Sequence, residues 1–241
     1  MVSYFPFRKQ HRLIDSSYFK GLTDWHSHIL PGVDDGIQAV NESLAVLREY
    51  EQMGIRRVWL TPHIMEDIPN TTETLREQFE KLRTTYTGSM ELHLASENMM
   101  DHTLHVRLSA NDMLPLGPTG GSLLVETSYY TAPFRFYETL EQIADMGYQP
   151  VLAHPERYVY MEQDDYRRLK ESGVMFQLNL LSMGGLYGKL AEKNAHQLLR
   201  LGCYELTGSD LHSVESINAL KQLKLSSPLI NELERIKENE L

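Results

Sequence analysis

Residues 145–157 read Asp-Met-Gly-Tyr-Gln-Pro-Val-Leu-Ala-His-Pro-Glu-Arg, a pattern that predicts the end of a helix, a short strand and a polar turn. Gly147 lies where the helix is expected to end, because glycine adopts the left-handed backbone conformation of a helix end at little cost. The apolar residues that follow, up to Ala153, predict a buried strand. His154 comes directly after them, so the stretch predicts a polar side chain at the carboxyl end of a strand.

The same connection recurs along the chain, each time with a glycine after a helix-like segment. The other three copies are Gln52-Met53-Gly54-Ile55, Glu171-Ser172-Gly173-Val174 and Arg200-Leu201-Gly202-Cys203. Strand-like apolar runs cover residues 58–60, 92–95, 122–125, 150–153, 174–178 and 204–207, and a first strand is expected near residues 23–25. Strands that alternate with helices predict an α/β fold with a parallel sheet of about seven strands, in which reacting groups gather at the carboxyl ends of the strands.

The length of 241 residues suits one undivided α/β domain. We expect a single domain over residues 1–241, with an N-terminal extension over residues 1–21 and a polar tail over residues 226–241. The tail is expected to form a solvated helix, with a partner contact as the alternative. Residues 98–122 are the least regular stretch of the chain.

The charge and hydropathy of the chain exclude several classes of partner. The net charge is −10 and no basic stripe is present, which argues against broad binding to nucleic acid. No apolar run approaches the roughly 20 residues of a membrane span, and the beginning of the chain lacks the apolar centre of a signal peptide. We therefore expect a cytoplasmic protein. The single cysteine, Cys203, permits no internal disulfide and fits a reducing compartment.

Histidines and carboxylates close the strand-like runs over almost the whole chain. His26 and His28 are two residues apart at a strand end, so both point the same way, and Asp210 and His212 repeat this spacing at the last strand. Imidazole and carboxylate together suit zinc, manganese or iron. One such pair is weak evidence, but two pairs at opposite ends of a strand-and-helix series predict a metal site.

The opening stretch, Asp24-Trp25-His26-Ser27-His28-Ile29-Leu30-Pro31-Gly32-Val33-Asp34-Asp35-Gly36, resembles the first motif of bacterial tyrosine phosphatases of the polymerase and histidinol phosphatase (PHP) type. Later motifs of that family are similar, in the same order, to Thr61-Pro62-His63, Val125-Glu126, Ala153-His154-Pro155-Glu156-Arg157-Tyr158 and Ser209-Asp210-Leu211-His212. The resemblance covers about residues 22 to 215 and points to the CpsB/CapC family of capsule and exopolysaccharide operons.

The resemblance implies a distorted (β/α)7 barrel of the PHP type that removes phosphate from tyrosines in the tail of a bacterial tyrosine autokinase. It also implies three divalent metal ions, often manganese, with iron and zinc as alternatives. One ion would take His26, His28, Glu97 and Asp210; a second would share Glu97 and add Glu126 and His154; the third would take Asp35, His63 and His212. Arg157 matches the family's phosphate-binding arginine.

The chemistry agrees with this allocation. Three divalent cations facing four carboxylates would leave a surplus of two positive charges, and Arg157 adds a third, which favours a phosphate dianion inside an acidic protein. Metals lower the pKa of bound water from about 16 to about 7, so attack of hydroxide on phosphorus is implied. Phosphotyrosine departs as a phenolate whose parent pKa is about 10, which makes a strong general acid less necessary. No general acid is assigned.

The chain departs from the family pattern after His212, where residues 213–217 contain no arginine. Arg135, in the loop after Glu126, is the candidate replacement for a second phosphate-binding arginine, and a surface arginine is the alternative. Asp35 competes with its neighbour Asp34, which would otherwise cap the helix beginning near Asn41 or stay solvated. Tyr129, Tyr130, Tyr158 and Tyr160 follow ligand-bearing strand ends, where they predict either an aromatic rim or ordinary packing.

Two other functions stay open at this point. A small-molecule phosphomonoesterase such as histidinol phosphatase shares the PHP barrel and much of the metal set. A noncatalytic module that binds the kinase would also keep the barrel, but some of its metal-ligand positions would be replaced by other residues. Every expected ligand position is filled in this sequence. The sequence therefore favours a metal-dependent protein-tyrosine phosphatase.

Overall fold

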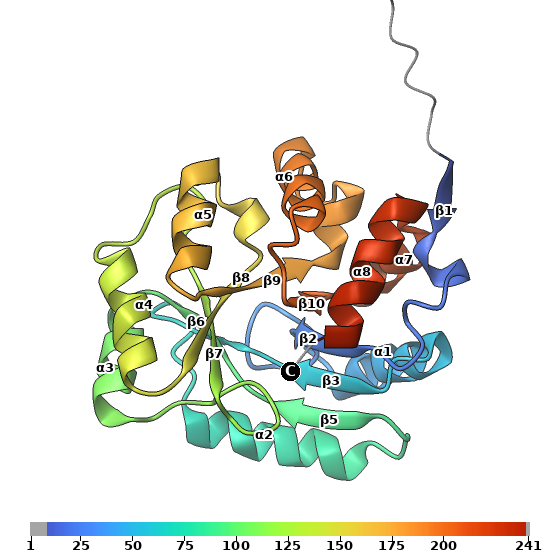
Figure 1. Cartoon of the computed structure of the whole chain (residues 1–241). Helices are drawn as coiled ribbons and strands as arrows, with labels where there is room; N and C mark the ends of the chain where they lie inside the picture. Colours follow the sequence, from blue (N-terminus) through green and yellow to red (C-terminus); the bar gives the residue numbers. More distant parts are fainter. Residues whose placement is uncertain (1–8, 240–241) are drawn as a thin grey trace, which may run out of the picture.

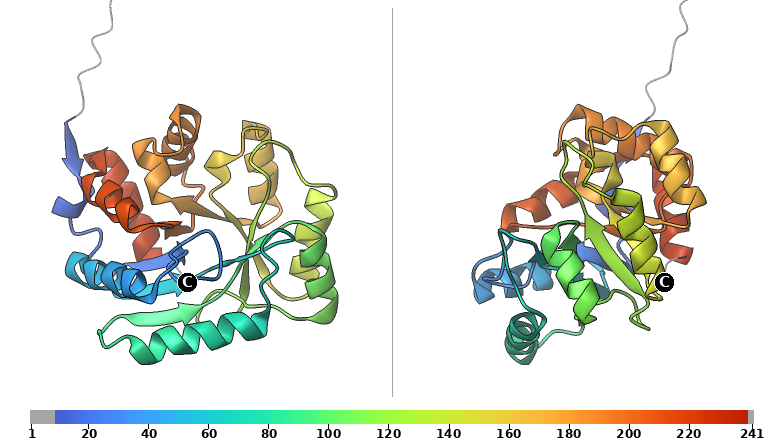
Figure 2. Two further views of the ribbon diagram at one scale, coloured as in Figure 1. Left: turned by 180° about the vertical axis from the view of Figure 1, so that it is seen from behind. Right: turned by 90° about the vertical axis from the view of Figure 1, so that its left-hand side faces the viewer.

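The computed structural model describes residues 9–239, in which helices lie along the outer side of a curled parallel sheet (Figure 1 and Figure 2). The helices are α1 (Val40–Met53), α2 (Thr72–Thr85), α3 (His102–Ala110), α4 (Phe136–Asp145), α5 (Gln163–Glu171), α6 (Lys189–Arg200), α7 (Val214–Gln222) and α8 (Ser227–Asn239). None of them is both long enough and apolar enough to cross a membrane. The mixed α/β fold that the sequence predicts is confirmed.

The parallel strands form two hydrogen-bonded groups. One group has the order β10 (Leu206–Gly208), β9 (Met175–Asn179), β8 (Gln149–Ala153), β7 (Ser122–Glu126), β6 (Glu97–Met99) and β4 (His63–Ile64), and the other has β2 (Thr23–Ser27), β3 (Arg57–Leu60) and β5 (Glu91–Leu94). Only Thr61 and Pro62 separate β3 from β4, and only Ala95 and Ser96 separate β5 from β6. The chain therefore passes directly from one group into the other, and together they make one curled layer.

The two outer strands of this layer, β2 and β10, approach each other at their carboxyl ends. The backbone N–H of Asp210 donates to the carbonyl of His26 at 2.8 Å, and that of His28 donates to the carbonyl of Leu211 at 3.0 Å. Gly208 makes this approach possible, because a Cβ atom there would lie 2.4 Å from the Cβ of His26. The first and last pairs of expected ligands, His26 with His28 and Asp210 with His212, are thus neighbours in space.

The core has two parts, one on each face of the curled sheet. The larger part contains the apolar faces of the helices and the strand residues that pack against them, such as Leu152 and Phe176. The smaller part contains no helical residue and includes Trp25 and Trp59, whose rings stack at 5.8 Å. Burial of both faces explains why the strand-like runs are apolar throughout rather than alternating.

The predicted helix-to-strand glycines are confirmed, because Gly54, Gly147, Gly173 and Gly202 all have positive φ. The segment that appeared least regular in the sequence, residues 98–122, contains a helix. α3 begins after Asp101, whose side chain accepts a hydrogen bond from the N–H of Leu104, and this cap compensates for the weakly amphipathic sequence.

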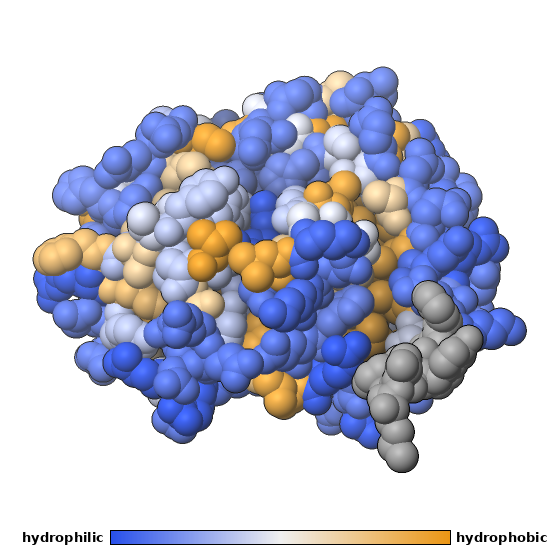
Figure 3. All heavy atoms as spheres, turned by 90° about the horizontal axis from the view of Figure 1, so that it is seen from above, coloured by the Kyte–Doolittle hydropathy of each residue, from blue (hydrophilic) through white to orange (hydrophobic). Residues whose placement is uncertain are grey.

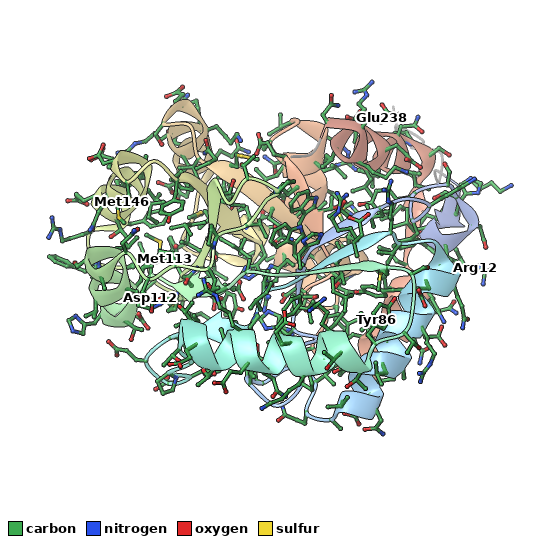
Figure 4. All side chains as sticks on the ribbon, turned by 90° about the horizontal axis from the view of Figure 1, so that it is seen from below. Arg12, Tyr86, Asp112, Met113, Met146 and Glu238 are labelled. Carbon is green, nitrogen blue, oxygen red and sulfur yellow. The ribbon has the colours of Figure 1, made fainter. Side chains whose placement is uncertain are left out.

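The expected solvated tail is instead a packed helix. Leu229, Ile230, Leu233 and Ile236 of α8 are buried, and their spacing puts them on one helical face. The charged residues that made the tail look polar lie on the other face. Seen from below, Glu238 of α8 and Arg12 of β1 (Gln10–Arg12) lie on the same side of the molecule (Figure 4).

The stretch expected as an N-terminal extension is part of this packing. β1 pairs antiparallel with β11 (Lys224–Ser226), and a single-turn helix (Leu13–Asp15) follows it. Leu13, Tyr18 and Phe19 belong to the larger core. Residues 1–8 and 240–241 of the expected extension and tail lie outside the described residues.

Candidate metal centre

The carboxyl ends of the strands bring all nine expected ligands together. Ligand atoms within 4.8 Å of one another form three overlapping groups: His26, His28, Glu97 and Asp210; His63, Glu97 and Glu126; and His28, Asp35, His63 and His212. The ninth residue, His154, adjoins the first two groups, since its Nε2 lies 2.9 Å from Oε1 of Glu97. Residues separated by nearly two hundred positions in the sequence therefore share one site.

Glu97 lies at the centre of the cluster and is fully buried. Its Oε2 is 3.1 Å from Nε2 of His26, 3.2 Å from Nε2 of His28 and 3.2 Å from Nδ1 of His63. Strand β6 places it there, because the chain crosses from β5 into β6 at the adjacent Ser96. One carboxylate thus faces four histidines, counting His154.

His63 lies between two of the groups. Its Nδ1 is 3.0 Å from Oε1 of Glu126, while its Nε2 is 3.4 Å from Oδ1 of Asp35. His154 is farther from Glu126, with Nε2 3.9 Å from Oε2. The expected division, in which His154 joins Glu126 and His63 joins Asp35, stays a prediction.

The outermost group opens to solvent. The side chain of Asp35 is 64% exposed, and its Oδ1 lies 3.5 Å from Nε2 of His212. The imidazole of His212, which donates to this carboxylate, is the main reason that the pKa of Asp35 falls to about 2. The other two groups are buried, so the centre has a closed inner part and an accessible outer edge.

The donor atoms fit divalent cations. Four buried side-chain atoms of this cluster have no hydrogen-bond partner among the described residues: Nδ1 of His63, Oε2 of Glu97, Oε1 of Glu126 and Nδ1 of His154. Three of these atoms converge without hydrogen-bond geometry, since Nδ1 of His63 lies 3.2 Å from Oε2 of Glu97 and 3.0 Å from Oε1 of Glu126. Buried polar atoms are normally paired, so atoms that converge without pairing are a natural arrangement for metal ligands.

The charges in the cluster support the same interpretation. Burial lowers the pKa of His26, but the carboxylates of Glu97 and Asp210 outweigh burial and raise it to about 9. Burial raises the pKa of Glu97, but the charges of His26 and His63 bring it well below its ordinary value. The cluster is thus rich in negative charge, which attracts protons to its histidines and would attract metal cations in their place.

Two of the expected ligands have strained backbones. His154 has φ 34° and Asp210 has φ 50°, and they are among four non-glycine residues with positive φ in residues 9–239. His154 follows β8 directly, and Asp210 follows β10 after Ser209, so both strained residues lie at the carboxyl ends of strands. Strained residues of this kind cluster at functional sites, where the surrounding structure holds them.

Arg157 lies beside the cluster in a rigid setting. Its Nη1 donates to Oδ2 of Asp210 at 2.7 Å, and its guanidinium lies 4.3 Å from the ring centre of Tyr129 and 4.0 Å from that of Tyr187. Sequence reasoning missed Tyr187, because it follows β9 after a single-turn helix (Leu180–Gly184) and no ligand motif precedes it. The two rings hold the guanidinium between them at the edge of the site.

Asp34 has a role that the sequence interpretation did not assign. It neither caps α1, which begins after Ala39, nor lies in solvent, because its side chain is fully buried. Oδ2 of Asp34 lies 2.8 Å from Nδ1 of His28 and accepts from the N–H of His63, while Oδ1 accepts from the N–H of Gly36. Gln177 makes the equivalent contact with His26, with Oε1 2.8 Å from Nδ1. Both contacts leave the Nε2 atoms facing the cluster.

We expect the Asp34→Asn change to weaken metal binding by about 10- to 100-fold, because outer partners that orient a ligating histidine have effects of this size. The amide also points an N–H₂ group at the backbone N–H of His63 or Gly36, from which the carboxylate now accepts a hydrogen bond. Titration of chelated protein with manganese measures the effect. The exposed Asp67→Asn change is the matched control, and equal manganese dependence in both variants would refute the role of Asp34.

Arg135 is not brought to the cluster by any contact found among the described residues. It precedes α4 with φ 59° and lines a hollow with Phe134, Tyr160 and Asp165. The hollow lies next to the candidate centre rather than within it. Its proposed contact with phosphate therefore stays a prediction.

Known proteins resemble this chain over most of its length. The profile of the family described as "Capsular polysaccharide synthesis, CpsB/CapC" matches residues 22–222. Tyrosine-protein phosphatase YwqE of Bacillus subtilis is 27% identical over 203 residues, which span 82% of this chain and 80% of that protein. Tyrosine-protein phosphatase CpsB of Streptococcus pneumoniae is 29% identical over 206 residues, which span 81% of this chain and 84% of that protein.

A solved structure supports the fold independently. It comes from a crystallographic study of YwqE from Bacillus subtilis and CpsB from Streptococcus pneumoniae, described there as unique metal-dependent tyrosine phosphatases. The TM-score is 0.74 at 24% identity, and the match covers 91% of this chain and 96% of the other. Since the family profile spans all the motifs that form the candidate centre, the resemblance inferred from the sequence is confirmed, and the chain belongs to the CpsB/CapC family of capsular polysaccharide synthesis.

Proposed function

We propose that this chain is a metal-dependent protein-tyrosine phosphatase that acts on the phosphotyrosine tail of a bacterial tyrosine autokinase in the cytoplasm. The observation that supports this most is the convergence of nine histidines and carboxylates beside a held arginine. The relatives named as tyrosine-protein phosphatases support the reaction class. We also propose that the curled sheet is a distorted (β/α)7 barrel of the PHP type.

Three divalent cations, with manganese as the first candidate, belong to this proposal. Their ligands would be His26, His28, Asp35, His63, Glu97, Glu126, His154, Asp210 and His212. When bound, they would supply Lewis-acid stabilisation of the phosphoryl oxygens and a source of hydroxide near neutral pH. The three unpaired ligand atoms that converge at His63, Glu97 and Glu126 support a role for metal in completing the site.

The residues of the chain hold the substrate in this proposal. Arg157 uses one donor on Asp210, so its remaining N–H groups are available for phosphate oxygens at the mouth of the site. Tyr129, which packs against Arg157 and His154, offers an aromatic face to the phenyl ring of phosphotyrosine. Asp34 and Gln177 fix the orientation of the two histidines that open the motif.

We expect a phosphotyrosine peptide to be hydrolysed only after manganese is restored to chelated protein, and not by the His26→Ala variant. His26 contacts both Glu97 and Asp210, so its loss removes a donor from the most buried group. Phosphate release with malachite green measures turnover. His11→Ala, at an exposed histidine of β1, is the control.

The alternatives give different results in the same assay. A large preference for histidinol phosphate over the phosphotyrosine peptide would favour a small-molecule phosphomonoesterase. Failure to hydrolyse either substrate with manganese, iron or zinc would favour a noncatalytic module that binds the kinase. The named activities of the relatives support the peptide substrate over both.

A further inference from the structure

The hollow beside the candidate centre is lined mainly by aromatic and apolar side chains. It has a volume of about 760 Å³ and is formed where the loop after β7 meets the start of α4 and the loop after β8. Phe134, Phe136, Tyr137, Tyr160 and Met161 supply most of its lining. A hollow of this size accommodates one large side chain together with a stretch of peptide backbone.

Side-chain contacts link the hollow to the centre. Tyr160, which lines it, has its hydroxyl 2.6 Å from Oγ1 of Thr127, the residue after Glu126. The ring of Tyr160 stacks on Tyr158 at 5.8 Å, and Tyr158 in turn stacks on Tyr129 at 6.2 Å. Tyr129 contacts Arg157, so a row of three tyrosines joins the hollow to the proposed phosphate site.

Unusually exposed apolar side chains surround this region. Phe134 is 89% exposed and Tyr130 is 75% exposed, and both belong to the loop between β7 and α4. Val159, in the neighbouring loop, is 51% exposed. In the face seen from above, hydrophobic side chains gather near the middle and protrude at the left, the side on which α4 lies (Figure 3). Exposed apolar groups gathered beside a site mark a binding surface.

The charges around the hollow exclude a second phosphate as its preferred ligand. Arg135 lines it together with the carboxylates of Glu138 and Asp165, and the guanidinium of Arg168 packs on the ring of Tyr137 at 4.6 Å. The charges of the two cations and two anions nearly cancel, so the net electrostatic potential in the hollow is small. The hollow therefore suits an uncharged apolar or aromatic side chain.

We propose that this hollow binds an apolar or aromatic side chain of the substrate peptide, close in sequence to the phosphotyrosine. The inference rests on the proposed phosphatase function, because the occupant is the chain that continues from the bound phosphotyrosine. An extended peptide advances about 3.3 Å per residue, so a side chain two to four positions away lies roughly 7–13 Å along it. The half-buried Tyr129 and Tyr160 offer that peptide contact near the phosphate site and at the hollow, and Tyr158 is buried between them.

The test compares three substrates: p-nitrophenyl phosphate, a phosphotyrosine peptide flanked by glycine and serine, and the same peptide with leucine or phenylalanine two to four positions away. Phe134→Ala combined with Tyr130→Ala is expected to raise KM for the apolar peptide by about 10-fold, the effect of exposing part of a buried aromatic side chain. Turnover of p-nitrophenyl phosphate and of the glycine peptide should not change. Both substituted side chains are exposed, so the fold is not at risk.

Leu201→Ala is the matched control, since Leu201 is 66% exposed on another part of the surface. Fluorescence anisotropy of the unphosphorylated apolar peptide measures binding to the hollow without hydrolysis. If the parent protein hydrolyses none of the substrates, the proposed function is wrong. Anisotropy then still shows whether the hollow binds the apolar peptide. Equal KM values for the two peptides in parent protein, or equal anisotropy in parent and double variant, would overturn the proposal.

Discussion

Glu97→Gln should remove nearly all metal-dependent turnover, with kcat/KM reduced by at least about 10³-fold. A lost outer partner of a ligand costs about 10- to 100-fold, and Glu97 belongs to two of the three groups of donor atoms. The amide keeps the shape of the side chain but removes the negative charge, and it offers only one oxygen to the donors that two oxygens now face. Metal content, measured by elemental analysis after dialysis, should fall together with turnover.

A second readout separates this effect from unfolding. The charge of Glu97 helps to raise the pKa of His26 to about 9 in the protein without metal, so the Gln variant should titrate His26 at lower pH. NMR of the imidazole resonances in chelated protein measures this change, and circular dichroism checks the fold. Glu77→Gln, at an exposed position of α2, is the control. Retained metal and turnover within tenfold of the parent would show that Glu97 is not a ligand.

Much of the site could be predicted because its ligands lie in short local motifs. A histidine pair at the end of a strand, or a carboxylate after an apolar run, has a fixed place on a parallel sheet whatever the details of packing. The glycines that end helices could be predicted for the same reason, because the φ of one residue determines the turn. These features need no knowledge of distant contacts.

The contacts that the sequence did not predict join distant residues or depend on how a loop folds. Asp34 orients His28 because the loop returns on itself at Gly36, where a Cβ would lie 2.3 Å from the carbonyl of His28. Tyr187 reaches Arg157 only because the segments after β8 and β9 lie side by side. The buried face of α8 was hidden by its many charged residues, although its apolar spacing was present in the sequence.

Arg157→Ala should lower kcat/KM for aryl phosphates by about 10²- to 10³-fold, the usual effect of removing one fixed donor to a developing negative charge. We expect Arg157→Lys to recover less than tenfold of this loss. An ammonium cannot present a planar fork to phosphate, and it stacks less well between the rings of Tyr129 and Tyr187. Arg168→Ala is the matched control, because that guanidinium also packs on a tyrosine but lies outside the centre.

The expected effect of Arg157→Ala is large because the segment after His212 supplies no second cation. Residues 213–217 contain no arginine or lysine, so Arg157 has no second cation from that segment to share the phosphate with. Its contact with Asp210 also ties the phosphate-binding group to a proposed ligand, at 2.7 Å. Metal content must therefore be measured beside turnover. Loss of turnover with full metal content would show that Arg157 binds the phosphate. Parallel loss of turnover and metal would show that Arg157 only positions Asp210. Undiminished turnover would show that the metal site recognises the phosphate without Arg157.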